Sequence, residues 1–501
     1  MAQQKSLKTT KAREIQAPSF SLASLNDEFL KFYWYNMPAS ARAMIGKERP
    51  QTAWIFGAGA SHHFDLNPFG VPVPLANGFF KAFHALPTSG GFNAHVGPLI
   101  SFLEHYRGVR VDRVGDFDEN IEDFMTSVES DIEKLRARMT KGRLTQREVS
   151  ARFSLASVFS NMNFIFANVL NEAQNGAPMS LYRHLLDICG PNDAFITFNW
   201  DTLLDRALAD TGGWSPNAGY GMKFRAVLDG GWSAAAKGAP QFETQWKLLK
   251  LHGSTNWLIP YMAINFQTLE YAPLIKQASS VFLYWYSSMP YATHHFRWRG
   301  GYVPTCYCYY PPNLPAKYFP NAQLRVGKGK VAMRVNLRIF SPFEEGADVG
   351  VPSSPFLITP VRQKKYDIYK SALEHLWEQA DTTLMTAKRI VVVGYSFPKT
   401  DVRPLGLLRN VLRKRGAEVD LEVVAPGVDS ILERIGDRDL ARAKSVKAFD
   451  MKFEAYIGML ARTIPEMMRH AAKENREVLN WLAVHFGMMH YALRKVTPNA
   501  R

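Results

Sequence analysis

The stretch Ile55-Phe-Gly57-Ala-Gly59-Ala-Ser61 decides the fold of this chain, because an apolar run breaks there into small residues. Residues 52–56 predict a short buried strand, and the two glycines after it predict a tight turn into a helix. A strand that ends in this way brings backbone N–H groups close to an anionic ligand, most often a pyrophosphate. The stretch therefore indicates a phosphate-binding turn in an α/β protein.

The same stretch departs from the fingerprint of dehydrogenases. That fingerprint places another glycine or alanine three residues after the second glycine, where this chain has His62. It also places an acid about 20 residues downstream to hold the ribose. No Asp or Glu occurs here between Asp65 and Glu104. The turn thus predicts a dinucleotide that is bound in a different way.

The composition is that of a globular protein from a reducing compartment. Of the 501 residues, 47% are hydrophobic and 21% are charged, which allows a substantial core. The three cysteines have neither disulfide nor zinc spacing, so we expect no metal and a cytoplasmic location. We find no signal peptide and no run of about 18 apolar residues that would cross a membrane. A net charge of +15 favours an acidic partner.

Apolar runs alternate with helical patterns along the chain. This alternation predicts a parallel, doubly wound α/β sheet, in which ligands bind at the carboxyl ends of the strands. After 52–56, strands are predicted at 193–197, 246–251, 389–393 and 419–424, and helices at 117–139, 154–170, 180–188, 202–209 and 402–415.

Polar side chains follow two of these strands. Asn199 and Asp201 come after the strand at 193–197, and His252 comes after the next one. Histidine titrates near neutral pH and suits a general base, whereas an asparagine amide can hold a water or a sugar hydroxyl. The set fits cleavage of an N-glycosidic bond. Each residue also has a structural alternative, because Asn-x-Asp is typical of a helix N-cap and a lone histidine is typical of a satisfied core residue.

Four motifs, in their order along the chain, resemble the signatures of the sirtuin fold. The resemblance spans roughly residues 50–426 and is strongest to the zinc-less, sirtuin-like NAD hydrolases of bacterial anti-phage defence. Ile358-Thr-Pro360 with Lys364 and Lys365, and the run 118–125, are similar to segments of that branch. The motifs are Gly-Ala-Gly-Ala-Ser at 57–61, Thr197-Phe-Asn-Trp-Asp201, Leu251-His-Gly-Ser254 and Gly394-Tyr-Ser396.

The resemblance implies a role for each motif residue, with NAD+ as substrate. Asn199 would orient the attacking water or the nicotinamide ribose, Asp201 would recognise the carboxamide, and His252 would be the base. The remaining residues would bind the other half of NAD+. They are Gly57, Ala58, Gly59 and Ser61 at the pyrophosphate, and Gly394 and Ser396 at the adenosine half.

The chain departs from protein-deacylating sirtuins at three places. Their zinc module of paired cysteines follows the histidine, whereas this chain has an acid-free segment with many bases and aromatics. Phe198 replaces a glutamine, and Ala425-Pro426 replaces an asparagine near the adenine. We therefore expect NAD+ hydrolysis to ADP-ribose and nicotinamide by the effector of an abortive-infection system. Its gate would be a homo-oligomer or a partner defence protein, such as an ATPase or a nucleic-acid-guided subunit.

Two other functions stay open on the sequence. One is NAD-dependent deacylation or ADP-ribosyl transfer, which needs an acyl-lysine channel or an acceptor site. The other is nucleotide sensing or nucleic-acid binding without turnover, which the net charge of +15 supports. The basic aromatic insert, at about 260–345, could bind nucleic acid by stacking, but we favour a β-rich lid or a partner face.

Three parts follow from these patterns. We expect an N-terminal tail and leading helix at 1–45, a sirtuin-like NAD-binding catalytic domain at 46–430, and a helical C-terminal segment at 431–501. Within the catalytic domain, a helical insert at about 75–190 separates the glycine turn from the next strand. The basic aromatic insert is the second insertion.

Overall fold

Chain contacts divide the protein into two compact units. The larger unit is Arg49–Gly458, and the smaller one combines Met1–Glu48 with Met459–Arg501. The smaller unit contains helix α1 (Asp27–Asn36), and the sheets and the pocket described below belong to the larger unit. The computed structural model describes residues 27–37, 51–64, 67, 69–86, 93–139, 141–142, 145–174, 176, 179–222, 224, 227–228, 232–233, 246–259, 262–265, 270–273, 281–284, 330–332, 354–361, 364 and 370–468.

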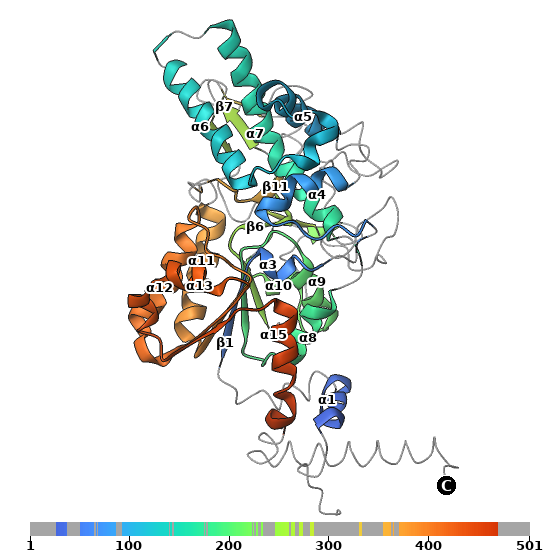
Figure 1. Ribbon diagram of the computed structural model, residues 1–501, viewed down its shortest axis with the longest axis vertical. Helices are drawn as coiled ribbons and strands as arrows, with labels where there is room; N and C mark the ends of the chain where they lie inside the picture. The colour runs from blue at the N-terminus through green and yellow to red at the C-terminus, as the bar shows by residue number, and fades with distance from the viewer. Residues whose placement is uncertain are drawn as a thin grey trace, which may run out of the picture. The chain divides into compact units, whose positions relative to one another are not determined.

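A six-stranded, fully parallel sheet forms the centre of the larger unit (Figure 1). Its strands lie in the order β14-β13-β12-β1-β2-β5, so the winding proceeds outward from β1 on both sides. This is the strand order of dinucleotide-binding Rossmann sheets. The predicted doubly wound α/β sheet is confirmed. The strands are β1 (Thr52–Phe56), β2 (Ala194–Thr197), β5 (Lys247–Lys250), β12 (Arg389–Val393), β13 (Asp420–Val424) and β14 (Ser445–Phe449).

The direction of winding reverses between β1 and β12. β1 pairs with β2 on one side and with β12 on the other. At such a switch point the loops after the two strands diverge and leave a crevice at the carboxyl edge of the sheet. Gly57 follows β1 and Gly394 follows β12. The glycine turn that the sequence singles out therefore lies at the switch point.

Helices cover both faces of the sheet, which explains why its central strands are apolar throughout. Every residue of β1 and of β2 is buried. In Figure 1, α11, α12 and α13 lie on one side of the sheet, and α8 and α9 lie on the other. These helices are α8 (Ser180–Ile188), α9 (Leu203–Asp210), α11 (Lys370–Thr386), α12 (Val402–Arg415) and α13 (Val428–Ile435).

The edge strand β14 corrects the expectation that residues from 431 onward are helical. β14 pairs in parallel with β13 and completes the sheet. Its residues are exposed or half-buried, so it lacks the apolar run that marks the other strands. The sheet therefore continues past residue 430. The C-terminal helix predicted from Pro465 onward lies mostly outside the described residues.

A block of helices separates β1 from β2. Its longest helix, α7, begins with a capping box in which Thr145 and Glu148 bond each other's backbone. Contrary to expectation, α7 is long and apolar enough to cross a membrane, but 81% of its apolar stretch is buried, which makes it the core helix of the block. The block contains α4 (Phe79–Ala85), α5 (Asn93–Arg107), α6 (Ile121–Met139) and α7 (Gln146–Ala173), with the short helices α3 (Ala58–Ser61), η2 (Ala76–Gly78) and η4 (Val111–Asp116) before them or between them.

Two small sheets are formed by strands that lie between β2 and β12 in the chain. One has the order β11-β6-β9-β3-β4, and the other has the order β10-β7-β8. Much of the insert at 260–345 lies outside the described residues, so its interpretations stay predictions. The remaining elements are β3 (Val227–Leu228), β4 (Trp232–Ser233), β6 (Gly253–Ile259), β7 (Met262–Asn265), β8 (Glu270–Pro273), β9 (Phe282–Tyr284), β10 (Lys330–Ala332), β11 (Ser354–Leu357), α10 (Pro216–Gly219), η9 (Gly416–Glu418), α14 (Asp437–Leu440) and α15 (Phe453–Ala461).

Candidate functional site

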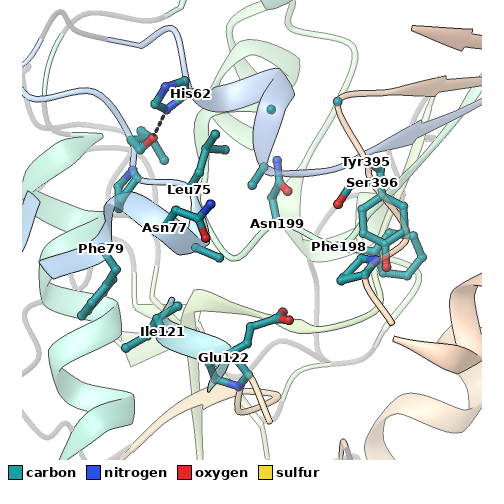
Figure 2. A pocket seen from close by; sticks show the side chains of 18 of the residues that line it. His62, Leu75, Asn77, Phe79, Ile121, Glu122, Phe198, Asn199, Tyr395 and Ser396 are labelled. Carbon is teal, nitrogen blue, oxygen red and sulfur yellow. Dashed lines mark hydrogen bonds between the residues drawn. The ribbon is translucent and has the colours of Figure 1, made fainter. Parts of the chain in front are cut away.

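A pocket of about 1030 Å³ lies at the carboxyl edge of the central sheet. Figure 2 shows Asn77 and Glu122 of the helical block on one side of this pocket, with Asn199 and Ser396 of the sheet loops on the other. The structure thus brings together residues that are far apart in sequence. The predicted site residues that line the pocket are Ala58, Gly59, Asn199, Asp201, His252, Gly394 and Ser396.

The glycines are needed where the turns after β1 and β12 touch. A Cβ on Gly57 would lie 2.6 Å from the Cα of Tyr395, and one on Gly59 would lie 3.0 Å from the Cα of Gly394. Gly394 has a φ of +60°, and a Cβ there would lie 2.4 Å from the backbone nitrogen of Ala60. The two turns are therefore in backbone contact, which only glycine permits at these positions.

Backbone donors of the turn are bonded within the protein. The N–H of Gly57 donates to Val393 O and the N–H of Gly59 donates to Gly394 O, each at 3.0 Å. The N–H of Ala60 donates to Gly57 O at the same distance. These three amides hold the turn, so they do not serve a pyrophosphate as the sequence suggested. Gly57 and Ser61, both predicted at the pyrophosphate, are buried and do not line the pocket.

Asn199 connects the end of β2 to the glycine turn. Its Nδ2 donates to Gly57 O at 2.9 Å and lies 3.2 Å from Ser61 Oγ. Ser61 Oγ in turn lies 3.1 Å from the hydroxyl of Tyr182 on α8. Because Nδ2 is bonded to the turn, Oδ1 is the atom with which Asn199 can accept a hydrogen bond from a ligand.

His252, just after β5, belongs to a buried cluster of charged groups at the pocket. Its Nε2 lies 3.3 Å from Oδ2 of Asp401. The same carboxylate oxygen lies 2.8 Å from Nζ of Lys364 and accepts a hydrogen bond from the hydroxyl of Tyr395 at 2.6 Å. Phe198 stacks on Tyr395 and packs against the imidazole. The ring is thus held in one orientation.

The charges around His252 favour a neutral imidazole. Burial lowers the pKa of His252; Asp401 opposes this shift and Lys364 adds to it. Burial also disfavours ionisation of Asp401, but His252 and Lys364 outweigh it and hold the pKa of Asp401 well below its usual range. An ionised Asp401 beside Nε2 selects the tautomer with its proton there. The basic lone pair is then on Nδ1.

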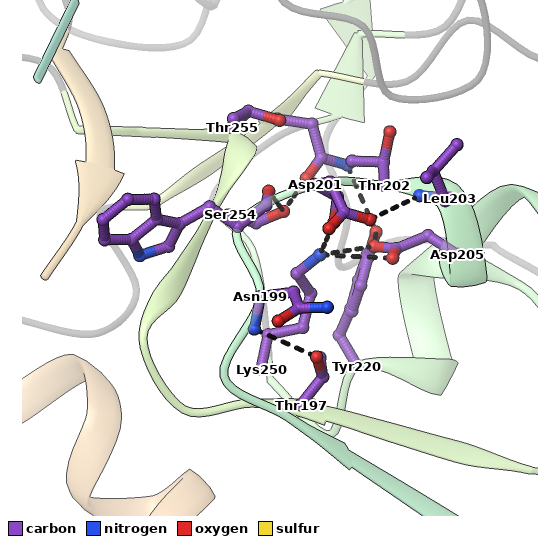
Figure 3. Close-up of polar contacts among 12 residues, drawn as sticks. Thr197, Asn199, Asp201, Thr202, Leu203, Asp205, Tyr220, Lys250, Ser254 and Thr255 are labelled. Atoms are coloured by element: carbon purple, nitrogen blue, oxygen red, sulfur yellow. Dashed lines mark hydrogen bonds and ion pairs between the residues drawn. The ribbon is translucent and has the colours of Figure 1, made fainter. Parts of the chain in front are cut away.

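Asp201 reaches the pocket from a second cluster, which Figure 3 shows. Its Oδ1 accepts from the N–H of Leu203 at 3.1 Å, an Asx-turn contact that precedes the N-cap residue of α9, Thr202. Lys250 lies 3.2 Å from Asp205 and also donates to the backbone oxygen of Asp201. Burial raises the pKa of Asp201, against the attraction of Lys250. Asp201 therefore combines a structural contact with a place in the pocket.

Sequence reasoning gave no role to several residues that the structure places here. The sequence did offer a signal for Asp401. It lies only a few residues beyond the Gly-Tyr-Ser motif and therefore follows the same strand, β12. Lys364 and Glu122 belong to segments quoted only for their resemblance. Nothing in the sequence pointed to the pocket-lining cations Lys399, Arg434 and Lys452. Within the part of the chain that the structure describes, no group of three or more His, Cys, Asp or Glu could hold a metal ion.

Comparison with known proteins gives a fold likeness only. No family model matches the chain, and no curated protein matches it in sequence. Among solved structures, a complex of a Sir2 homologue with ADP-ribose is 12% identical, covering 86% of this chain and 97% of that chain with a TM-score of 0.30. A Sir2 homologue–NAD complex is 11% identical, covering 85% and 93% with a TM-score of 0.32. The fold assignment therefore rests on the strand order described above.

Proposed function

We propose that this chain is an NAD+ glycohydrolase, which cleaves NAD+ to ADP-ribose and nicotinamide. One observation carries the proposal: Asn199 and the His252–Asp401 pair line a single pocket at the switch point of a Rossmann-ordered sheet. The pocket, at about 1030 Å³, is in the range of sites that enclose a large organic ligand.

The residues suggest how the bond is cleaved. The bond between nicotinamide and C1′ of the ribose breaks with positive charge developing on C1′, and its electron pair leaves with a neutral nicotinamide. A water attacks C1′, and His252 takes its proton on Nδ1. Asp401 stabilises the imidazolium that forms. Asn199 Oδ1 accepts a hydrogen bond from the water or from a ribose hydroxyl.

The position of His252 also supports one direction for bound NAD+. The nicotinamide ribose lies at the ends of β2 and β5, with Asp201 available to the carboxamide. The diphosphate crosses the switch point at Ala58 and Gly59. The adenosine half extends over the ends of β12 and β13, past Ser396, where Arg434 donates to the backbone oxygen of Ser396 at 2.6 Å.

The test is to follow nicotinamide release from NAD+ by chromatography with the purified full-length chain. His252→Ala should reduce the rate by about 10²- to 10⁴-fold, because the base is lost. Asn199→Ala should have a similar effect and also loosen the glycine turn. His375→Ala, on an exposed histidine of α11, is the matched control and should keep the wild-type rate. Full activity in both site variants would contradict the proposal.

Hydrolysis is to be separated from deacylation in the same assay. An acetylated lysine peptide should leave the rate of nicotinamide release unchanged if water is the acceptor. Release that depends on the peptide would instead favour NAD-dependent deacylation. Transfer of labelled ADP-ribose to a protein would favour the transferase alternative.

The biological setting we propose is anti-phage defence, with activity released by a partner or by oligomerisation. The motif resemblance supports this setting. Cells that carry the chain should lose NAD+ after phage infection, and cells that carry His252→Ala should not. Loss of NAD+ in both, or in neither, would contradict it.

A further inference from the structure

Glu122 brings a carboxylate from the helical block into the pocket. It lies in the first turn of α6, and Figure 2 shows its side chain directed toward the pocket interior. Its Oε2 accepts a hydrogen bond from Thr400 Oγ1 at 2.7 Å, and its Oε1 lies 4.0 Å from Nζ of Lys364. The carboxylate is therefore held in place by contacts from two other segments of the chain.

Lys364 does not neutralise both carboxylates beside it. Its Nζ is 2.8 Å from Asp401 but 4.0 Å from Glu122, so it pairs chiefly with Asp401. With the neutral imidazole that burial favours, the cluster of His252, Asp401, Lys364 and Glu122 contains two carboxylates and one ammonium. Their side chains are only 1–19% exposed, where water and salt screen charge weakly. Among the residues that the structure describes here, one negative charge is thus left uncompensated at this end of the pocket.

The other cations of the pocket are placed differently. Lys399 and Lys452 line it but are exposed, so water screens their charges. Arg434 is half-buried, and its guanidinium donates to the backbone oxygens of Ser396 and Phe397 after β12. Arg434 therefore lies beside the adenosine half in the proposed orientation. The negative end of the pocket adjoins His252.

We propose that Glu122 makes this end of the pocket selective for a cationic N-ribosyl ring, so that the site takes oxidised pyridinium nucleotides and rejects their neutral, reduced forms. This inference rests on the proposed function, which places the nicotinamide ring beside His252. The carboxylate attracts the positive ring in the bound substrate. As the ring leaves in its neutral form, the same charge stabilises the cation that develops on C1′.

The test uses carbocyclic NAD+, in which carbon replaces the ribose ring oxygen, and its dihydronicotinamide form. Neither is hydrolysed, and the two differ mainly in the charge of the ring. We expect the wild-type chain to bind the oxidised form about tenfold more tightly, as measured by calorimetry. In Glu122→Gln the preference should fall at least threefold, because Gln keeps an acceptor for Thr400 but carries no charge. Glu119→Gln, which removes a neighbouring carboxylate outside the pocket, should keep the wild-type ratio.

Each result decides the inference. A wild-type preference below threefold, or a preference in Glu122→Gln within threefold of wild type, would overturn it. The binding measurement needs no turnover, so it stands even if the chain releases no nicotinamide and the proposed function fails. If the chain does hydrolyse NAD+, Glu122→Gln should lower kcat about 10- to 100-fold and raise KM a few-fold, because both the transition state and the bound cationic ring lose an attraction. A rise in KM with unchanged kcat would contradict the effect on C1′.

Discussion

Two buried clusters of charged groups lie next to each other at the end of β5, and they differ in what they face. Lys250, the last residue of the strand, pairs with Asp205, and both side chains are at most 1% exposed. His252, two residues later, pairs with Asp401, and their side chains are 5% and 1% exposed. Burial alone does not distinguish the clusters. Of the two pairs, only His252 and Asp401 line the pocket.

The Lys250 cluster is saturated by protein groups. Asp205 also accepts from the hydroxyl of Tyr220, and this hydroxyl accepts from Nδ2 of Asn256 at 3.2 Å. Ser254 Oγ then donates to Asn256 Oδ1 at 2.6 Å. A closed network of this kind orders the fold, whereas the His252 cluster presents its groups to a ligand. A charged residue at a strand end is therefore a functional candidate only when its own side chain lines a pocket, as that of Asp201 does and that of Lys250 does not.

The largest expected effect is on the free energy of unfolding, and it tests whether the Lys250 cluster orders the fold. Asp205→Asn should lower the free energy of unfolding by about 3–5 kcal/mol, because it leaves the ammonium of Lys250 without its buried counter-charge. Denaturant unfolding measures this loss. Asp210→Asn, at the exposed end of the same helix, should cost less than about 0.5 kcal/mol. A loss below about 1 kcal/mol for Asp205→Asn would contradict the structural role given to the Lys250 cluster.

The matching change in the pocket cluster should act on the reaction. Asp401→Asn should reduce nicotinamide release about 100-fold, equivalent to about 2.7 kcal/mol, because the imidazolium loses its anionic partner. Asp205→Asn, assayed at a temperature where it stays folded, should retain most of the activity. Equal losses of rate in the two variants would show that the clusters do not have separate uses.

The pH dependence should shift in a defined direction. The proposed reaction requires the base form of His252. Burial lowers the pKa of His252, so the acid limb of kcat/KM in the wild type should lie below the usual histidine value of about 6.5. Asp401 raises this pKa, so Asp401→Asn should move the limb to still lower pH. A pH–rate profile of the wild type and one of Asp401→Asn measure the positions of the two acid limbs. Movement toward higher pH would contradict the role given to Asp401.

The smallest effect is expected at Ser254, although it belongs to a sequence motif. Ser254→Ala removes a hydrogen bond to Asn256 in the closed cluster and should cost about 1 kcal/mol of stability. Its rate of nicotinamide release should equal that of wild type, since Ser254 does not line the pocket. A tenfold loss of rate would place Ser254 in the reaction instead.

The sheet could be predicted from sequence because its inner strands are short apolar runs that end at glycine or polar clusters. Thr52–Phe56 and Arg389–Val393 were predicted with the observed ends. β14 was missed, since an edge strand with exposed residues such as Val446 carries no such signal. Local pattern thus finds strands that are covered on both faces and overlooks the one that is not.

The candidate site was predictable only where its residues follow a strand directly. Asn199, Asp201 and His252 do so, and the fold then brings them to one edge. The contacts of Glu122 cannot be read in this way, because Thr400 is 278 positions away in the sequence. The role of the glycines could not be predicted either. A turn that needs small residues to admit a ligand has the same sequence pattern as a turn that needs them for packing.

The contact between the two turns limits how this pocket can diversify. A side chain at Gly57 would meet backbone atoms of Tyr395, and one at Gly394 would meet the backbone of the opposite turn. Shortening a neighbouring side chain cannot compensate for either change, so the two turns can only vary together. New ligand preferences must then arise in the walls, and engineering should begin at positions such as Asn77 and Ser430, which line the pocket away from this contact.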